Sequence, residues 1–142
     1  MKIRIQLLQP EATPPRYATE GAACFDLFAA DAARVYAKQS AVIPTGLAVE
    51  VPWGYAMLVH SRSGHGFKHG VRLANCTGVI DSDYRGEVMV CLHNDGLADM
   101  VIAPGDRIAQ AMIVQAPLIT FEVAEQLSLT DRGHGGFGST GK

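Results

Sequence analysis

The chain has 142 residues, of which 48% are hydrophobic and 18% charged, so it is long and apolar enough to bury the core of one domain. Its net charge of −2 argues against direct nucleic-acid binding, and no stretch approaches the roughly 18 apolar residues of a membrane span. The N-terminus alternates like a strand and lacks a signal-peptide core, and the three cysteines include no CxxC pair. We therefore expect a soluble protein of a reducing, cytoplasmic compartment.

Strand-like segments follow one another from the N-terminus onward. They alternate or form short apolar runs over 3–7, 47–51, 55–59, 71–73, 88–92, 108–114 and 119–123. Turn residues separate them, and Asn94-Asp95-Gly96 is a strong hairpin signal. Helix is expected to be scarce, with room for one turn over 29–33 and too many glycines over 63–70 for a stable helix. The pattern predicts an all-β barrel or double-sheet roll.

Two polar segments in the first half are candidates for anion or metal binding. Asp26 lies between apolar residues, as either the cap of a turn or a carboxylate held near a metal. The turn Ser61-Arg62-Ser63-Gly64 combines hydroxyls, a guanidinium and a glycine amide, which is the chemistry of a phosphate cradle. As an isolated match of four residues it is a weak signal.

The most informative segment is GVIDSDYRGE, residues 78–87, which leads from an apolar strand into a cluster of charged residues. The strand end delivers Asp81 to a turn, and Tyr84 lies where a strand-turn-strand would fold over a ligand. An ordinary solvated acidic turn is the alternative, because Asp, Ser and Gly are common turn formers. Further along, Gln110 interrupts a strand of buried character, where an amide must be hydrogen-bonded and is more often structural than functional.

The last twelve residues, 131–142, carry five glycines and show no periodicity. A frayed terminus is the usual fate of such a segment. The functional alternative is an anion-binding arm, in which glycine amides approach phosphates, Arg132 and Ser139 add donors, and Phe137 stacks on a nucleobase. We expect a β domain over 1–130 and a mobile arm over 131–142.

In order, these five segments resemble the five motifs of the trimeric dUTP diphosphatase (dUTPase) family. GVIDSDYRGE, GDRIAQ and RGHGGFGST match throughout, and the resemblance runs from about Ala22 to Thr140. It implies a jelly-roll-like, all-β protomer, a homotrimer with three shared active sites, and Mg²⁺-dependent hydrolysis of dUTP to dUMP and pyrophosphate. That reaction would limit uracil incorporation into DNA and supply dUMP for dTMP synthesis.

The resemblance also implies a role for each matching residue. Asp81 resembles the general base that orients a water for attack on the α-phosphorus, and Asp26 the carboxylate that holds Mg²⁺ through water. The phosphate-contacting positions are Arg62, Ser63, Gly64 and Gln110. The hairpin that surrounds deoxyuridine, with Tyr84 excluding a 2′-hydroxyl, contains Asn75, Val79, Ile80, Tyr84, Gly86 and Met89. The arm, which would close over the active site, supplies Arg132, Phe137, Gly138 and Ser139.

The sequence departs from the family pattern in its first two motifs. Cys24 stands where the first motif has glycine. The second motif usually reads Pro-Arg-Ser-Gly-Leu-Ala, but here Ser61 replaces the proline and His65-Gly66 replace Leu-Ala. His65 and His69 have the spacing of a zinc pair on a helix, but the glycines around them argue against that helix and no third ligand is evident, so zinc is not expected.

Two other functions stay open. An enzyme like the related dCTP deaminases would share the fold and phosphate loops but act on the 4-amino group of the base. A nucleotide-dependent regulatory protein would use the same fold to bind a partner.

Overall fold

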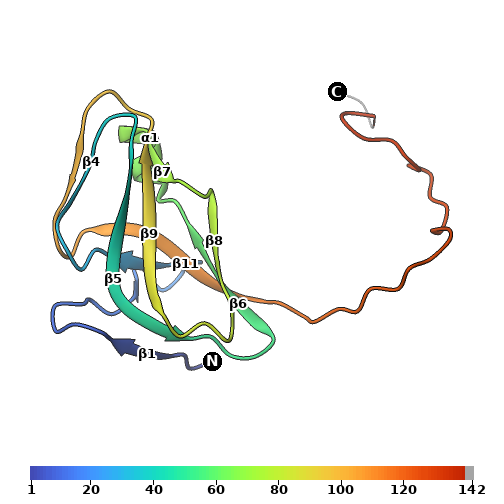
Figure 1. The fold of residues 1–142 in the computed structure, drawn as a ribbon, viewed down its shortest axis with the longest axis horizontal. Coiled ribbons are helices and arrows are strands. Elements are labelled where there is room, and N and C mark those ends of the chain that lie inside the picture. The colour runs from blue at the N-terminus through green and yellow to red at the C-terminus, as the bar shows by residue number, and fades with distance from the viewer. Residues whose placement is uncertain (140–142) are drawn as a thin grey trace.

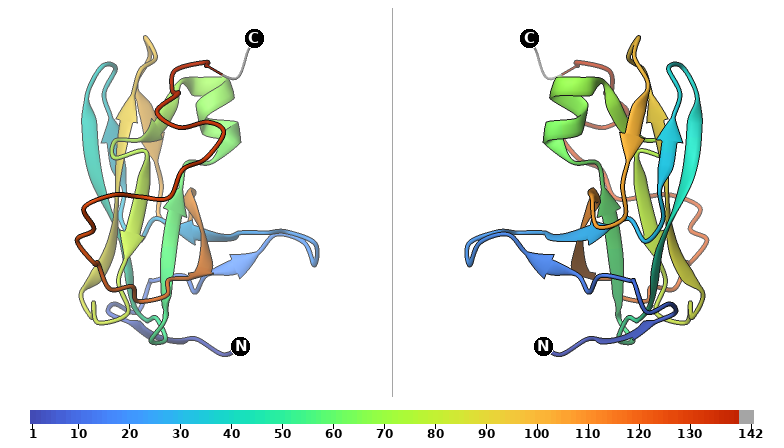
Figure 2. Two further views of the ribbon diagram at one scale, coloured as in Figure 1. Left: turned by 90° about the vertical axis from the view of Figure 1, so that its right-hand side faces the viewer. Right: turned by 90° about the vertical axis from the view of Figure 1, so that its left-hand side faces the viewer.

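Two antiparallel β-sheets form the body of the molecule in the computed structural model, which describes residues 1–139 (Figure 1). In strand order, the four-stranded sheet contains β1 (Arg4–Leu7), β5 (Ser40–Glu50), β9 (Glu87–Asn94) and β7 (Val71–Leu73). The five-stranded sheet contains β2 (Arg16–Tyr17), β3 (Phe25–Phe28), β11 (Arg107–Gln115), β6 (Tyr55–His60) and β8 (Thr77–Ile80). A separate pair joins β10 (Met100–Ile102) to β4 (Ala33–Val35). The β2–β3 region projects sideways from this body (Figure 2).

The core lies between the two sheets because their strands alternate. On β9, Val88, Val90 and Leu92 are buried, whereas Met89 between them is exposed. Residues from β3, β6 and β11 form the same apolar cluster from the other sheet, so the two inner faces pack on each other. The expected all-β, double-sheet architecture is confirmed.

The expectation of no helix over 63–70 is wrong, because α1 spans Ser63–His69. Gly70 ends it in the left-handed conformation, with φ 66°, and donates its amide to the Gly66 carbonyl at 3.1 Å. No residue of α1 is buried, and each interior glycine costs about 1 kcal/mol relative to alanine. The helix therefore depends on its polar attachments to the strands around it. It is the one helix among residues 1–139, and no helix there is long and apolar enough to cross a membrane.

The prediction of a β-hairpin at Asn94-Asp95-Gly96 is also wrong. The turn forms, with the Gly96 amide donating to Asn94 Oδ1 at 2.9 Å, but the strand after it, β10, pairs with β4 instead of β9. The buried Asn94 amide donates to the carbonyls of Val35 and Ala98. These bonds direct the chain toward β4. The helical turn expected over 29–33 is absent as well, since this segment bends directly into β4.

The strand expected over 119–123 does not form. The Ala116 amide donates to the Gly54 carbonyl at 2.8 Å, and Pro117 then lacks the amide hydrogen that a further ladder bond would need. From there to Ser139 the chain contains no helix or strand and runs away from the body (Figure 1). Thr140, the last residue of the glycine-rich motif, lies outside the described residues with Gly141 and Lys142.

Candidate active site

The register of the five-stranded sheet brings two of the predicted polar residues side by side. Asp26 on β3 pairs with Gln110 on β11, and Gln110 pairs with His60 at the end of β6. Directly opposed residues of paired strands project their side chains to the same face. Since Ser61 and Arg62 follow His60, the sheet collects the first, second and fourth motifs at one place.

A cavity of about 380 Å³ lies at this place. It is lined by Ala18, Ala22, Ala23, Cys24, Asp26, Arg62, Ser63, Gly64, Arg107 and Gln110. The predicted phosphate-contacting and metal-binding residues therefore share one cavity.

The charges in this cavity favour an anion. Asp26 is only 8% exposed, with Arg62 Nε 3.5 Å from its Oδ1 and Arg107 Nη1 3.3 Å from its Oδ2. Two guanidinium groups around one carboxylate leave a net positive charge beside the Ser63 hydroxyl and the Gly64 amide. Arg107 was not among the predicted site residues. Its position inside GDRIAQ, three residues before Gln110, is the signal that could have found it.

Gln110 also supports the loop that carries Arg62. Its Nε2 donates to the Ser61 carbonyl at 3.0 Å, so part of its hydrogen-bonding capacity is structural. The side chain lines the cavity as well, and contact with phosphate stays a prediction for its remaining groups.

The loop that carries Asp81 connects the two sheets. β8 is an edge strand paired with β6, whereas β9 pairs with β5 and β7, so the deoxyuridine hairpin expected from the sequence is not a paired hairpin. Within residues 1–139, one backbone edge of β8 consequently has no partner strand. Asp81 is exposed at the end of β8, in a cavity of about 370 Å³ that Trp53 and Asp83 also line.

Tyr84 folds over the backbone of this loop. Its hydroxyl donates to the Glu87 carbonyl at 2.9 Å, and a Cβ added at Gly86 would lie 2.5 Å from that hydroxyl oxygen. Only glycine at residue 86 leaves room for the ring in this position. Of the other predicted nucleoside contacts, Ile80 is half-buried, and Asn75, Val79 and Met89 are exposed.

The two halves of the predicted site lie far apart within one chain. Ile80 pairs with Met57, which brings Asp81 to the level of Ala56 at the start of β6, whereas Arg62 follows the end of β6. Six residues at about 3.3 Å each separate the two levels by roughly 20 Å. The cavity around Arg62 and the Asp81 of the same chain are therefore separate.

Comparison with known proteins places this arrangement in a family. The sequence profile of the dUTPase family matches residues 10–141. This chain belongs to the dUTPase family. It is 46% identical over 144 aligned positions to the deoxyuridine 5′-triphosphate nucleotidohydrolase of Nautilia profundicola, with both chains covered completely. It is 50% identical over 131 positions to that of Caulobacter vibrioides NA1000, covering 89% of this chain and 84% of the relative.

Solved dUTPase structures share the fold. The dUTPase of Staphylococcus bacteriophage 80alpha with dUpNHpp superposes with a TM-score of 0.92 at 29% identity, covering 99% of each chain. A dUTPase variant of phage phi11 of S. aureus superposes with a TM-score of 0.83 at 26% identity, covering 89% of this chain and 98% of that chain. That structure is described as revealing the coordination of a structural Mg(II) ion. The resemblance predicted from the motifs is confirmed.

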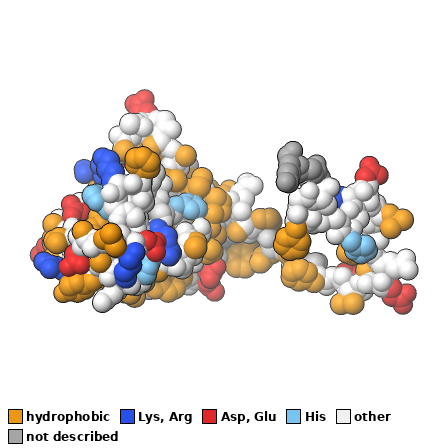
Figure 3. Space-filling model, turned by 90° about the horizontal axis from the view of Figure 1, so that it is seen from above, with side chains coloured by type: hydrophobic (Ala, Val, Ile, Leu, Met, Phe, Trp, Pro, Cys, Tyr) orange, Lys and Arg blue, Asp and Glu red, His pale blue; other side chains and the backbone are white. Residues whose placement is uncertain are grey.

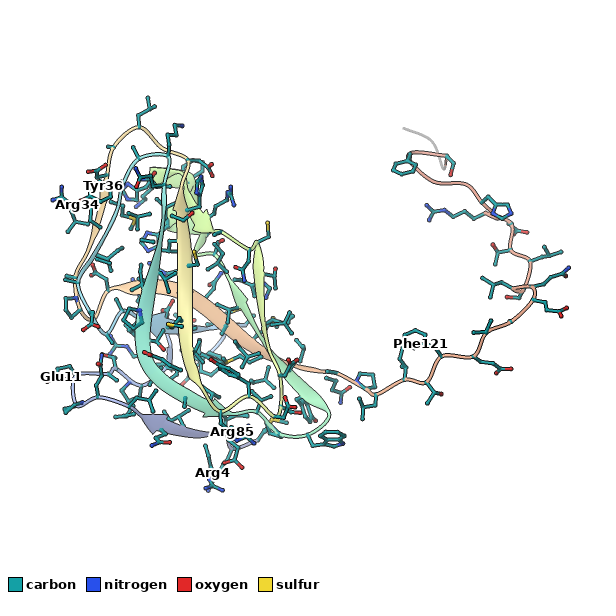
Figure 4. All side chains as sticks on the ribbon, in the orientation of Figure 1. Arg4, Glu11, Arg34, Tyr36, Arg85 and Phe121 are labelled. Carbon is teal, nitrogen blue, oxygen red and sulfur yellow. The ribbon has the colours of Figure 1, made fainter. Side chains whose placement is uncertain are left out.

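In this member of the dUTPase family, the described part of the arm, residues 131–139, lines neither cavity. Arg132 Nε donates to the Gly135 carbonyl at 2.8 Å, and Phe137 is fully exposed with φ 47°. Gly138 adopts φ 88°, and the Ser139 amide donates to the Gly136 carbonyl at 3.1 Å. The labelled Phe121 lies on the same extended segment, away from the sheets (Figure 4). A role for the arm in the site remains a prediction.

Proposed function

We propose that this chain hydrolyses dUTP to dUMP and pyrophosphate, and thereby limits uracil incorporation into DNA and supplies dUMP for dTMP synthesis. One observation carries the proposal: the buried Asp26 and two arginines line an anion cavity with Ser63, Gly64 and Gln110, in a chain of the dUTPase family. Arg62, the Ser63 hydroxyl and the Gly64 amide bind the triphosphate, and Arg107 adds a second cation.

The residues around Asp26 fit Mg²⁺ held through water. Both carboxylate oxygens already face guanidinium groups, at 3.5 and 3.3 Å, so direct ligation would compete with two ion pairs. Magnesium commonly keeps several waters and takes its other ligands from phosphate oxygens. When bound, it neutralises and orients the triphosphate. Asp26 would hold the hydrated ion, and the arginines would bind the phosphate oxygens.

Asp81 is the general base of the reaction. Its carboxylate accepts a proton from a water while the water oxygen forms a bond to the α-phosphorus. The bond from that phosphorus to the bridging oxygen breaks, and pyrophosphate leaves with the electron pair. Exposure of Asp81 at the end of β8 supports this role because the carboxylate is free to contact a water.

Selection of deoxyuridine follows from the same loop. The free backbone edge of β8, backbone groups beyond Gly86 and the Asn75 amide pair with the uracil edge, and Val79, Ile80 and Met89 supply apolar contacts. Cytosine reverses the donor and acceptor at its 4-position and would leave buried partners unpaired. The Tyr84 ring stacks on the deoxyribose and excludes a 2′-hydroxyl.

A homotrimer accounts for the distance between the two halves. Because about 20 Å separates the levels of Arg62 and Asp81 in one chain, the Arg62 cavity needs the Asp81 loop of a neighbouring subunit. Exposed apolar side chains on the strands, including Val42 and Met89, support such contacts.

The arm of a subunit then closes over a bound nucleotide. In Figure 3 the segment after β11, which ends in the arm, forms a separate lobe with apolar side chains on its surface, and its Phe121, Val123 and Leu129 are at least 90% exposed. Docking on a neighbour buries such groups, with Phe137 stacked on uracil, Arg132 on the phosphates, and the Gly138 and Ser139 amides beside them.

Pyrophosphate release tests the proposed reaction. With Mg²⁺, we expect release from dUTP and little from dTTP, dCTP or UTP, and a large loss after chelation of the metal. Equal release from all four nucleotides would contradict the proposal. Ammonia release from dCTP would identify the deaminase alternative.

A nucleotide-dependent regulatory function is a second candidate. One observation favours it: the phage 80alpha structures are described as dUTPases that control transfer of virulence genes by a proto-oncogenic G protein-like mechanism. A pull-down with and without dUpNHpp tests whether this chain binds any partner only with nucleotide. Identical capture in both conditions would exclude the regulatory function.

A further inference from the structure

The first turn of α1 is fastened to β11 by a histidine side chain. His65 Nε2 lies 2.7 Å from the carbonyl oxygen of Arg107. A carbonyl oxygen only accepts hydrogen bonds, so the Nε2 hydrogen of the ring is directed at it. Arg62 Nη1 donates to the same oxygen at 3.1 Å. His65 Nε2 and Arg62 Nη1, 3.2 Å apart, are therefore two donors that share one acceptor with two lone pairs.

This carbonyl is available because β11 is irregular at its start. Pairing with β6 begins only at Gln110, and the register against β3 shifts between Arg107 and Ala109. A bulge of this kind leaves backbone groups outside the ladder. The side chains of Arg62 and His65 provide the missing partners.

The shared carbonyl fixes one side of the Arg62 guanidinium, and Asp26 fixes the other. Arg62 Nε is 3.5 Å from Asp26 Oδ1, while Nη1 contacts the Arg107 carbonyl. His65 does not line the cavity, in contrast to Arg62. Any influence of the ring on a bound anion therefore passes through Arg62.

No buried side chain holds this turn in place. His65 is flanked by Gly64 and Gly66, no residue of α1 is buried, and Phe67 is 94% exposed. Glycine neighbours provide no side-chain packing and increase the conformational freedom of the backbone. The side-chain contact of His65 is thus the restraint on the first turn of α1 that comes from within the helix, beside those that Ser61 and Arg62 make.

Ser61 restrains the loop from the opposite side. Its Oγ accepts the Leu73 amide at 2.8 Å, and its carbonyl accepts Gln110 Nε2 at 3.0 Å. Ser61 and His65 are two of the three replacements, with Gly66, at which the second motif departs from the usual pattern. Side-chain hydrogen bonds here supply a rigidity that a proline before Arg62 would supply by fixing φ.

We propose that His65 is a positioning residue that holds Arg62 in the geometry that binds the triphosphate. This inference rests on the proposed function, since it assumes that Arg62 contacts phosphate. Without the ring, the first turn of α1 moves more freely and Arg62 loses order. Binding nucleotide then costs additional conformational entropy, which appears as weaker affinity.

The charge of the ring is compatible with this role. Burial is the largest influence on the pKa of His65 and lowers it below 6.5, and Arg62 and His69 lower it further. The hydrogen bond to the Arg107 carbonyl and the Asp106 carboxylate oppose the shift only in part. The ring is therefore neutral at pH 7 and does not repel Arg62.

The test compares two replacements by their affinity for dUpNHpp and by steady-state kinetics. His65→Leu removes the donor at similar size, and we expect it to raise Kd and KM about three- to tenfold, the worth of one neutral hydrogen bond, with kcat nearly unchanged. His65→Gln retains an N–H at a similar reach, and we expect it to stay within about twofold of wild type. His69→Gln, on the same helix, is the matched control and should match wild type. Equal effects of Leu and Gln would overturn the positioning role.

A double-mutant cycle separates this inference from the proposed function. If His65 acts through Arg62, His65→Leu has little further effect on dUpNHpp affinity in an Arg62→Ala background. Additive losses would show that His65 acts independently and would refute the inference. If Arg62→Ala itself leaves affinity and pyrophosphate release unchanged, the phosphate site of the proposed function fails. If Arg62→Ala weakens binding and His65→Leu does not, only the role of His65 fails.

Discussion

At the scale of single residues, turnover depends on Asp81 in the proposed mechanism. Asp81→Asn preserves the shape of the side chain but removes the group that accepts a proton. We expect kcat to fall by about 10² to 10⁴, while the Kd for dUpNHpp changes little. Pyrophosphate release and ligand titration on the same preparation measure the two quantities.

An aspartate-to-asparagine replacement away from the proposed site provides the control. Asp31→Asn alters an exposed carboxylate in the segment before β4 and should leave kcat unchanged. If Asp81→Asn retains wild-type kcat, Asp81 is not the base.

Tyr84 should determine discrimination against the 2′-hydroxyl. Tyr84→Ala removes the ring that lies over Gly86, and we expect kcat/KM for UTP relative to dUTP to rise about tenfold or more. Tyr84→Phe keeps the ring and loses only the bond to the Glu87 carbonyl, so it should retain the preference for dUTP. An unchanged ratio in Tyr84→Ala would assign the discrimination to another group.

At the scale of elements, α1 should make stability depend on pH. Burial lowers the pKa of His65 in the folded protein below its unfolded value of 6.5. As pH falls below 6.5, the unfolded chain takes up a proton before the folded one. The free energy that the neutral ring contributes to folding is therefore lost as pH falls from 6.5 through the pKa of His65 in the folded protein.

His65→Gln tests this dependence because glutamine does not titrate. Between pH 7.5 and pH 5, the Tm of wild type should fall more steeply than that of His65→Gln, as measured by circular dichroism. Parallel curves of Tm against pH for the two proteins would mean that His65 has the same pKa in the folded and unfolded states.

At the scale of the whole molecule, the arm should contribute to turnover and not to folding. Ala116 donates to the Gly54 carbonyl, and no strand follows it among the described residues. Truncation after Thr130 should therefore leave Tm and oligomeric state nearly unchanged while lowering kcat, because closure excludes water from the site. Full activity of the truncated protein would mean that the arm is only a frayed terminus without a role in turnover.

Sharing of sites between subunits can be tested by complementation. We expect Arg62→Ala and Asp81→Asn subunits each to be inactive alone. In the proposed homotrimer, a site that takes Arg62 from one subunit and Asp81 from the next is intact once in every mixed trimer. Random exchange in an equal mixture should restore about a quarter of wild-type activity. Activity no higher than that of the separate variants, after exchange is verified, would contradict a shared site.

Much of the fold and the site could be predicted from local sequence. The alternation of Val88, Val90 and Leu92 predicted a strand with one buried face, which β9 confirms. The residues predicted to contact phosphate or metal line one cavity: Asp26, Arg62, Ser63, Gly64 and Gln110. Arg107 was missed although it lies inside GDRIAQ, because its ion pair with Asp26, at 3.3 Å, joins residues that are distant in the sequence.

Sequence alone determined the β character, the order of the motifs and the residues that we propose to carry the chemistry, since these depend on side-chain type and short periods. Tertiary structure decided which strands pair, why α1 forms despite its glycines, and that Asp81 lies about 20 Å along β6 from Arg62. The physical reason is that these features depend on contacts between residues distant in the chain. Asn94 directs the chain to β4 and His65 fastens α1 to β11, and no local window of sequence contains both partners.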